Sequence, residues 1–184
     1  DRTRAINAIK MLFSARGLDL PFEDLTTLKA GKWLSGQDDL VIKHFGKMLS
    51  DFNEAIKNFE KEIEKSLPEK ARKLKQIKGI SDLTAAIIYT ETKGEIISPE
   101  ALASYAGIAP VEHSSGKTSK HRNNKSGNRK LNSVFYRISI HQSRFDEKGK
   151  AYYEKKLAEG KTKRHARKCL ARQLVRLVFN LLKD

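Results

Sequence analysis

The stretch VIKHFGKMLSDFNEAIKNFEKEI, residues 41–63, decides the fold class, because its apolar side chains repeat at a helical period. Every seventh residue is apolar, at Ile42, Leu49, Ile56 and Ile63, and a phenylalanine stands three positions after each of the first three. Such a heptad repeat forms an apolar seam along one side of a long helix. The 42–63 helix is therefore predicted either to pair with another copy, as a coiled coil or helix hairpin, or to pack inside a bundle of its own chain.

Most of the remaining chain also has a helical pattern. Apolar residues recur at helical spacing over 1–16 and again from Asn128 to the C-terminus. Ser98-Pro99-Glu100 combines an N-cap residue, a proline at the first helical position and an acid in the first turn, which is typical of a helix start. We therefore expect a mainly α fold.

The exception is the stretch PVEHSSGKTSKHRNNKSGNRKL, residues 110–131, which has few apolar side chains to bury. Its glycines and its Ser and Asn residues predict a polar loop or a small hairpin over 110–127. The expected organisation is a helical linker and coiled-coil segment at 1–70 and a second domain at 71–184. This second domain would end in basic helices over 128–184.

The positive charge is concentrated in the second half of the chain. The formal net charge is +15, with 37 Lys and Arg against 22 Asp and Glu. Residues 1–112 are balanced, whereas residues 113–145 carry Lys and Arg without any Asp or Glu. A charge gathered in one region predicts a polyanionic partner, and nucleic acid fits best. A basic surface without a dedicated partner is the alternative.

Residues 74–92 resemble a helix-hairpin-helix motif in their spacing. Leu74, Ile77, Gly79 and Ile80 stand where two short helices would meet at a glycine turn. In that motif, backbone N–H groups at the start of the second helix bind a DNA phosphate, which makes Gly79 and Ser81 candidate DNA contacts. A plain turn with Ser81 or Asp82 as N-cap is the alternative.

The paired serines, Ser114 and Ser115, allow two kinds of chemistry. A serine hydroxyl can donate a hydrogen bond to a phosphate oxygen, or it can attack phosphorus and form a covalent intermediate. Both uses require positive charge around the phosphate. Nearby residues could supply that charge: Lys117, Lys120, Arg122, Lys125, Arg129 and Lys130. The residues alone favour the positioning role.

Other classes of site and partner are disfavoured. His113 and His121 flank the serines without a set of Cys or acidic residues, so no metal site is expected. No apolar run approaches the ~20 residues of a spanning helix, and a membrane partner is not expected. The single Cys169 is interpreted as a core thiol, and because one cysteine allows no internal disulfide, the sequence suits a reducing compartment. Since the sequence begins in helical period and without Met, we expect a fragment of a longer protein.

Three ordered segments together resemble a known family. IKGISDLTAAII, LASYAGIAPVEHSSGKTSKHR and SGNRKLNSVFYRISIHQSR are similar to the C-terminal domain of DEDD-type insertion-sequence transposases. The resemblance implies a DNA transposase or recombinase fragment whose serine takes part in strand cleavage and exchange. The family's Ser-Gly motif falls on Ser115-Gly116, so Ser115 is the expected nucleophile and Ser114 the alternate.

The resemblance also implies partners and a cofactor. An upstream RuvC-like domain would bind Mg²⁺ through four acidic residues, and this fragment would hold no cofactor and be inactive alone. Some members are guided by a bridge RNA, and the coiled coil helps to assemble dimers and tetramers. A non-catalytic DNA- or RNA-binding module and a purely structural assembly module remain as alternative functions.

Overall fold

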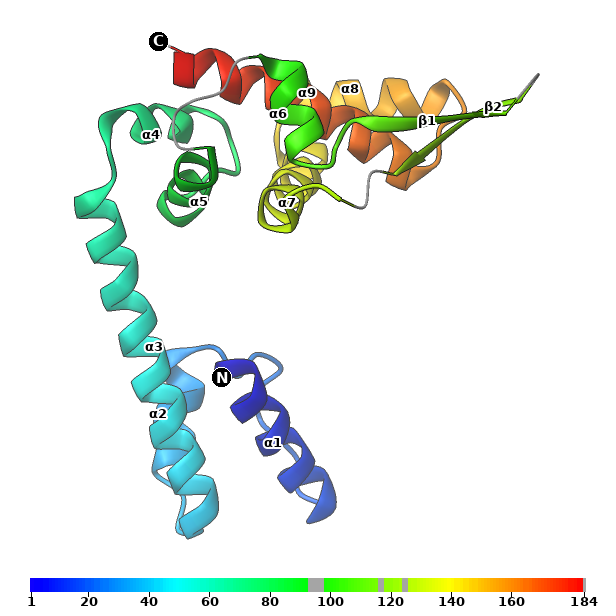
Figure 1. The fold of residues 1–184 in the computed structure, drawn as a ribbon. Helices are drawn as coiled ribbons and strands as arrows, with labels where there is room; N and C mark the ends of the chain where they lie inside the picture. The colour runs from blue at the N-terminus through cyan, green and yellow to red at the C-terminus, as the bar shows by residue number, and fades with distance from the viewer. Residues whose placement is uncertain (93–97, 116–117, 124–125, 184) are drawn as a thin grey trace. The chain divides into compact units, whose positions relative to one another are not determined.

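The computed structural model describes residues 1–92, 98–115, 118–123 and 126–183, with the backbone alone over 111–115 and 118–123. The chain divides into two compact units, which we call unit 1 (Asp1–Glu62) and unit 2 (Ile63–Asp184). This division falls near the end of a long helix, whereas the boundary expected from the sequence was residue 70. The fold is mainly α, as predicted, with one short hairpin (Figure 1).

Unit 1 is built on α1 (Arg2–Ala15), α2 (Leu28–Ser35) and the first part of α3 (Leu40–Ser66). Two of these helices begin at side-chain caps. Thr27 accepts a hydrogen bond from the Ala30 backbone N–H at 3.3 Å, and Asp39 accepts from Val41 and Ile42 at 2.9 and 3.0 Å. These bonds satisfy N–H groups that a helix start leaves unpaired. Mainly because it accepts from the Ile42 backbone N–H, Asp39 has a pKa below the ordinary value.

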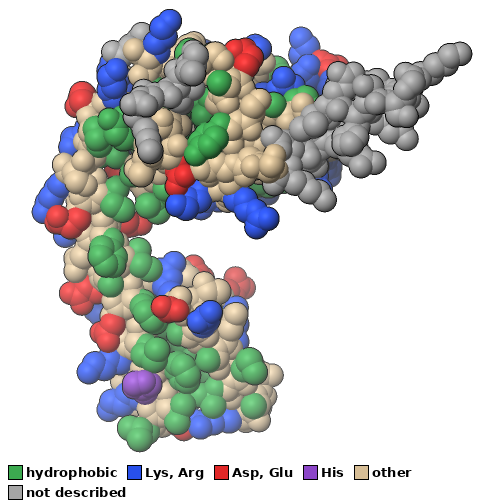
Figure 2. All heavy atoms as spheres, viewed as in Figure 1, with side chains coloured by type: hydrophobic (Ala, Val, Ile, Leu, Met, Phe, Trp, Pro, Cys, Tyr) green, Lys and Arg blue, Asp and Glu red, His purple; other side chains and the backbone are tan. Residues whose placement is uncertain are grey.

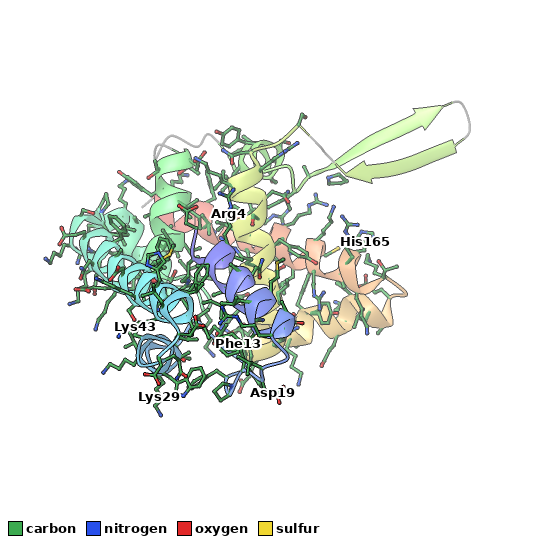
Figure 3. All side chains as sticks on the ribbon, turned by 90° about the horizontal axis from the view of Figure 1, so that it is seen from below. Arg4, Phe13, Asp19, Lys29, Lys43 and His165 are labelled. Atoms are coloured by element: carbon green, nitrogen blue, oxygen red, sulfur yellow. The ribbon has the colours of Figure 1, made fainter. Side chains whose placement is uncertain are left out.

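The apolar seam of α3 is used within unit 1 along its first half. Ile42 and Leu49 are buried in a core that also contains Phe13, labelled in Figure 3, and Leu34. Phe59, farther along the seam, is 68% exposed. Figure 2 shows hydrophobic side chains reaching the surface of unit 1 among charged ones. The bundle interpretation therefore describes the first half of the seam, and pairing with another copy stays a prediction for the second half.

Unit 2 contains a second core and the hairpin. Its elements are, in order, α4 (Glu69–Lys73), the 3-10 helix η1 (Leu74–Gln76), α5 (Asp82–Thr92), α6 (Pro99–Tyr105), β1 (Pro110–Ser115), β2 (Thr118–Asn123), α7 (Arg129–Phe145), α8 (Glu147–Ala158) and α9 (Lys163–Lys183). Phe135 of α7 and Leu174 of α9 are fully buried at its centre. As the sequence predicted, α6 starts at Ser98, whose hydroxyl accepts from the Ala101 backbone N–H at 3.1 Å, and Pro99 follows it.

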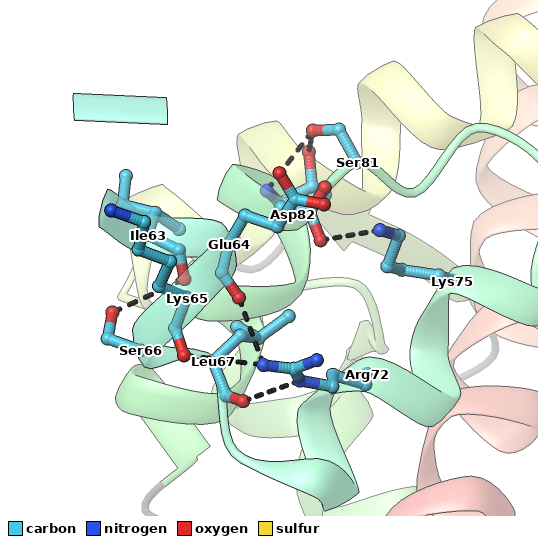
Figure 4. A network of polar contacts seen from close by, with 10 residues as sticks. Ile63, Glu64, Lys65, Ser66, Leu67, Arg72, Lys75, Ser81 and Asp82 are labelled. Carbon is cyan, nitrogen blue, oxygen red and sulfur yellow. Dashed lines mark hydrogen bonds and ion pairs between the residues drawn. The ribbon is translucent and has the colours of Figure 1, made fainter. Parts of the chain in front are cut away.

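The end of α3 is fixed by a cation of α4 (Figure 4). The Arg72 guanidinium donates to the Leu67 carbonyl at 2.9 Å and to the carbonyls of Glu64 and Lys65 at 3.2 and 3.3 Å. The last carbonyls of a helix have no partner within the helix, and a cation there also meets the negative end of the helix dipole. Arg72 thus serves the fold. Over the described residues, the structure has no helix of sufficient length and apolarity to cross a membrane.

Candidate functional site

The serine stretch forms a two-stranded antiparallel hairpin, which was one of the two expected outcomes. Ser115 pairs with Thr118, and Ser114 pairs with Ser119, so both serines lie at the end of the hairpin that is remote from α6 and α7. Lys120 and Arg122 lie in β2, opposite His113 and Val111. Lys117 and Lys125 lie outside the described residues.

The base of the hairpin is closely packed onto α6 and α7. A Cβ atom added at Gly127 would lie 2.4 Å from the Cα of Gly107, a separation that only glycine permits. Gly107 itself has φ +67°, in the left-handed region that favours glycine. Next to these glycines, the Asn128 backbone N–H donates to the Tyr105 carbonyl at 2.7 Å. The two glycines therefore let the chain that enters β1 and the chain that leaves β2 touch at one point.

Asn128, the N-cap of α7, and Asn132 of α7 complete this contact, which we call the hairpin anchor (Gly107, Gly127, Asn128 and Asn132). The Asn132 amide donates to the carbonyls of Ala106 and Gly107 at 2.9 and 3.1 Å. Asn128 caps α7, accepting from the backbone N–H groups of Lys130 and Leu131 at 3.0 and 3.1 Å. These bonds connect the C-terminal end of α6 to the start of α7. The hairpin is thus held at its base by backbone groups that would otherwise lack partners.

A carboxylate of α5 joins the hairpin anchor. Glu91 accepts from the Lys130 ammonium at 2.7 Å and from the Asn128 amide at 2.6 Å. The Lys130 hydrogen bond and then that of Asn128 lower the pKa of Glu91 below its ordinary value, and Glu91 in turn raises the pKa of Lys130. Lys130 was a predicted nucleic-acid contact, and the structure gives its charge an internal partner. Arg129, the preceding residue and also a predicted nucleic-acid contact, is exposed at the start of α7.

The Gly79 turn is also held by contacts with other residues of the protein. Gly79 has φ +93°, and a Cβ added there would lie 2.9 Å from Nδ1 of His141. The Gln142 amide donates to the Lys78 carbonyl at 3.0 Å. Ser81 caps α5, accepting from the Thr84 backbone N–H at 3.3 Å, which decides between the two cap candidates. DNA contact at Gly79 and Ser81 stays a prediction.

The cations beside this turn have carboxylate partners. Lys75 pairs with Asp82 at 2.7 Å (Figure 4), and Lys78 pairs with Asp146 at 3.5 Å. No group of three or more His, Cys, Asp or Glu side chains suited to a metal ion occurs within the described residues.

Sequence reasoning missed the hairpin anchor. Glu91 is separated from Asn128 by 37 positions and Asn132 from Ala106 by 26, so no local pattern relates them. The visible signals were Gly127 and Asn128 before a helical pattern, which indicate a helix start but not its partners.

Comparison with known proteins shows what this part of the chain is similar to. Residues 71–154 match the sequence profile of the transposase IS116/IS110/IS902 family. This segment is therefore similar to a domain of IS110-type transposases. It includes the Gly79 turn, the serine hairpin and the hairpin anchor. A relative in Streptomyces coelicolor, described as "Insertion element IS110 uncharacterized 43.6 kDa protein", is 31% identical over 156 residues. The alignment covers 82% of this chain and 38% of the relative, so the chain spans less than half of that protein's length.

Proposed function

We propose that this chain is the C-terminal part of a DNA transposase and supplies a nucleophilic serine for cleavage and exchange of an insertion sequence. The observation that carries the proposal is the hairpin, which places paired serines beyond an internally bonded base, within a segment that matches the transposase IS116/IS110/IS902 family. A loop that serves only as a connection does not need a base fixed by two close-packed glycines and three backbone carbonyls.

The proposed step is an attack on a DNA phosphodiester. The serine Oγ forms a bond to phosphorus, the bond from phosphorus to one deoxyribose oxygen breaks, and the serine proton leaves as that oxygen gains one. The product is a phosphoserine ester that retains the energy of the broken strand, and a DNA hydroxyl reverses the step on a new partner. Phosphoryl transfer depends mainly on alignment and on positive charge around the phosphate. Mg²⁺ held by an upstream acidic domain would stabilise charge on the phosphate.

Ser115 is the preferred nucleophile and Ser114 the alternate. Ser115 is the last residue of β1 and directly precedes the connection to β2. The Ser-Gly motif of the family also falls on this position.

Further parts of the proposal concern partners and place. A guide RNA would select the DNA, and the basic residues of the hairpin would contact nucleic acid. Dimers or tetramers would form through the second half of the α3 seam, where Phe59 is exposed and Ile56 and Ile63 are half-buried. The protein would act in the bacterial cytoplasm, at the nucleoid.

The first test compares three serine variants in the complete protein. Ser115→Ala should reduce strand joining by about a thousandfold or more while DNA binding stays unchanged. Ser119→Ala, in the same hairpin, is the matched control and should retain joining. If Ser115→Ala and Ser114→Ala each lower joining by only about tenfold, the hydroxyls act as single hydrogen-bond donors and the domain is a binding module.

A further inference from the structure

Two hollows in the surface of unit 2 lie next to each other beside α9 and share lining residues. Their volumes are about 400 and 200 Å³, and Ala109, Cys169 and Arg172 line both of them. Pro99 and Ser104 of α6 line the first hollow, and Thr162 and Pro110 line the second. We call this feature the α9 groove.

One side of the α9 groove is a row of cations. Every fourth residue of α9 is basic at this surface, and such a spacing forms one inclined row along a helix. The four residues are Arg164, Lys168, Arg172 and Arg176, and all of them line the hollows. At about 1.5 Å of rise per residue, the row is about 18 Å long. It is long enough for several phosphates of one strand.

The three arginines of this row have no acidic partner among the described residues. The sequence of α9, Lys163–Lys183, contains no Asp or Glu. Within the described part of the chain, no ion pair involves Arg164, Arg172 or Arg176. Burial is the main cause that lowers the pKa of Lys168, and repulsion from the nearby Arg164 lowers it further. A bound anion would relieve that repulsion.

The other groups of the groove suit a nucleotide chain. The Tyr152 ring lines the first hollow, its hydroxyl lies 3.4 Å from the Gln173 amide, and Lys156 lies 5.3 Å from the ring centroid. His165, labelled in Figure 3 near the start of α9, lines the second hollow. Glu100 is the carboxylate that lines the first hollow. A cationic row next to aromatic rings is the usual arrangement in sites for single-stranded nucleic acid, where bases stack and phosphates pair with cations.

The groove reaches the hairpin. Ala109 lines both hollows, and Pro110, which lines the second, is the first residue of β1. Figure 1 shows α6, α9 and the start of β1 close together. At about 3.3 Å per residue, Ser114 and Ser115 follow Pro110 by about 13 and 17 Å along the strand. A nucleic-acid strand that leaves the groove at this end is therefore directed toward the serines.

We propose that the α9 groove binds the phosphate backbone of a single DNA strand and leads it to the serine hairpin. The identity of that strand as substrate rests on the proposed function. Hollows of a few hundred Å³ are the size of small-molecule pockets and admit nucleotides of one strand rather than a duplex. DNA is the occupant because the groove opens at the hairpin that would react with DNA.

The binding test uses the complete protein with Ser115→Ala, so that no chemistry takes place. The probe is a fluorescein-labelled oligothymidylate of about 15 nucleotides, compared with an oligouridylate and a DNA duplex of equal length. In the groove variant, Arg164, Lys168, Arg172 and Arg176 are changed to Gln. In the control variant, four exposed cations outside the groove are changed to Gln: Lys61, Lys70, Arg144 and Lys155.

The groove variant should bind the DNA strand about a hundredfold more weakly. The slope of log Kd against log salt concentration should also fall by about three, since each of the four phosphate contacts to a single strand contributes about 0.7 to that slope. The control should lose less than about fivefold. Equal losses in the two variants would overturn the proposal. So would a loss confined to duplex DNA or to RNA. Neither result bears on serine chemistry, which strand joining measures separately.

A second measurement needs no substitution of the cations. Cys169 lines both hollows and is the single cysteine of this chain. Bound oligothymidylate should slow alkylation of Cys169 by a bulky maleimide at least about tenfold, as measured on its peptide by mass spectrometry. Alkylation at an unchanged rate under saturating DNA would contradict occupation of the groove.

Discussion

The hairpin anchor and the α9 groove lie in the same unit, and both are rich in polar and cationic side chains. In the anchor, each of these groups meets another group of the protein: Lys130 meets Glu91, and the Asn132 amide meets two carbonyls. In the groove, Arg164, Arg172 and Arg176 lack an ion pair among the described residues and line an open hollow. The difference separates a region that fixes a structure from one that is suited to an external polyanion. Changes in the anchor should therefore affect stability first, and changes in the groove should affect binding first.

The strongest test of the anchor is the addition of a single methyl group at Gly127. Gly127→Ala would place a Cβ 2.4 Å from Gly107, and because backbone atoms are involved, α6 and α7 must separate. We expect the free energy of opening of α7 amides near the anchor, measured by hydrogen exchange, to fall by about 2–3 kcal/mol. Gly160→Asn is the control, since nothing lies within 4 Å and Asn tolerates φ +78°. An unchanged opening free energy in Gly127→Ala would contradict the close packing.

A smaller loss should follow from removing one amide. Asn132→Ala leaves the carbonyls of Ala106 and Gly107 without their side-chain donor, and we expect the opening free energy at the anchor to fall by about 1–2 kcal/mol. In Asn132→Asp the opening free energy should fall at least as far, because a carboxylate cannot donate a hydrogen bond to these carbonyls. Asn180→Ala, on the exposed side of α9, should change it by less than about 0.5 kcal/mol. Equal effects at positions 132 and 180 would remove the distinction between the anchor and the surface.

The smallest expected effect is a dependence on pH. The folded pKa of Glu91 is lowered, first by the Lys130 hydrogen bond and then by that of Asn128. The carboxylate therefore contributes stability above its ordinary pKa of 4.5, and this contribution is lost as the pH falls through the lowered value. Protection of the anchor amides should decline over this acid range in the native protein, and Glu91→Gln should flatten the decline. A Glu91 carboxyl resonance that titrates at or above its ordinary value would refute the ion pair.

The periodic parts of the fold could be predicted from the sequence. The heptad stretch lies within α3, and Ser98 and Pro99 start α6, because these signals depend on neighbouring residues. The serine stretch was left open between a loop and a hairpin, since its polar residues fix no register. The structure provides that register.

The anchor and the groove could not be predicted from the sequence, for different reasons. The anchor joins α5, α6 and α7 through residues distant in the sequence, which follow no period. The basic spacing of α9 is visible in the sequence, but the hollow beside it requires α6. Cys169 shows the same limit: its apolar-periodic context predicted a core thiol, whereas it is half-buried and lines the groove. In the sequence it lies between Lys168 and Arg172, two cations of the row.

The central claim is that the hairpin serine forms a covalent link to DNA. The most direct measurement is mass spectrometry of the complete protein after reaction, with any guide RNA that it uses and a nicked DNA substrate that traps intermediates. The account predicts DNA attached to the peptide that contains Ser114 and Ser115, and loss of this adduct in Ser115→Ala but not in Ser114→Ala. Strand transfer that continues without any such adduct would contradict the claim and reduce the serines to phosphate contacts.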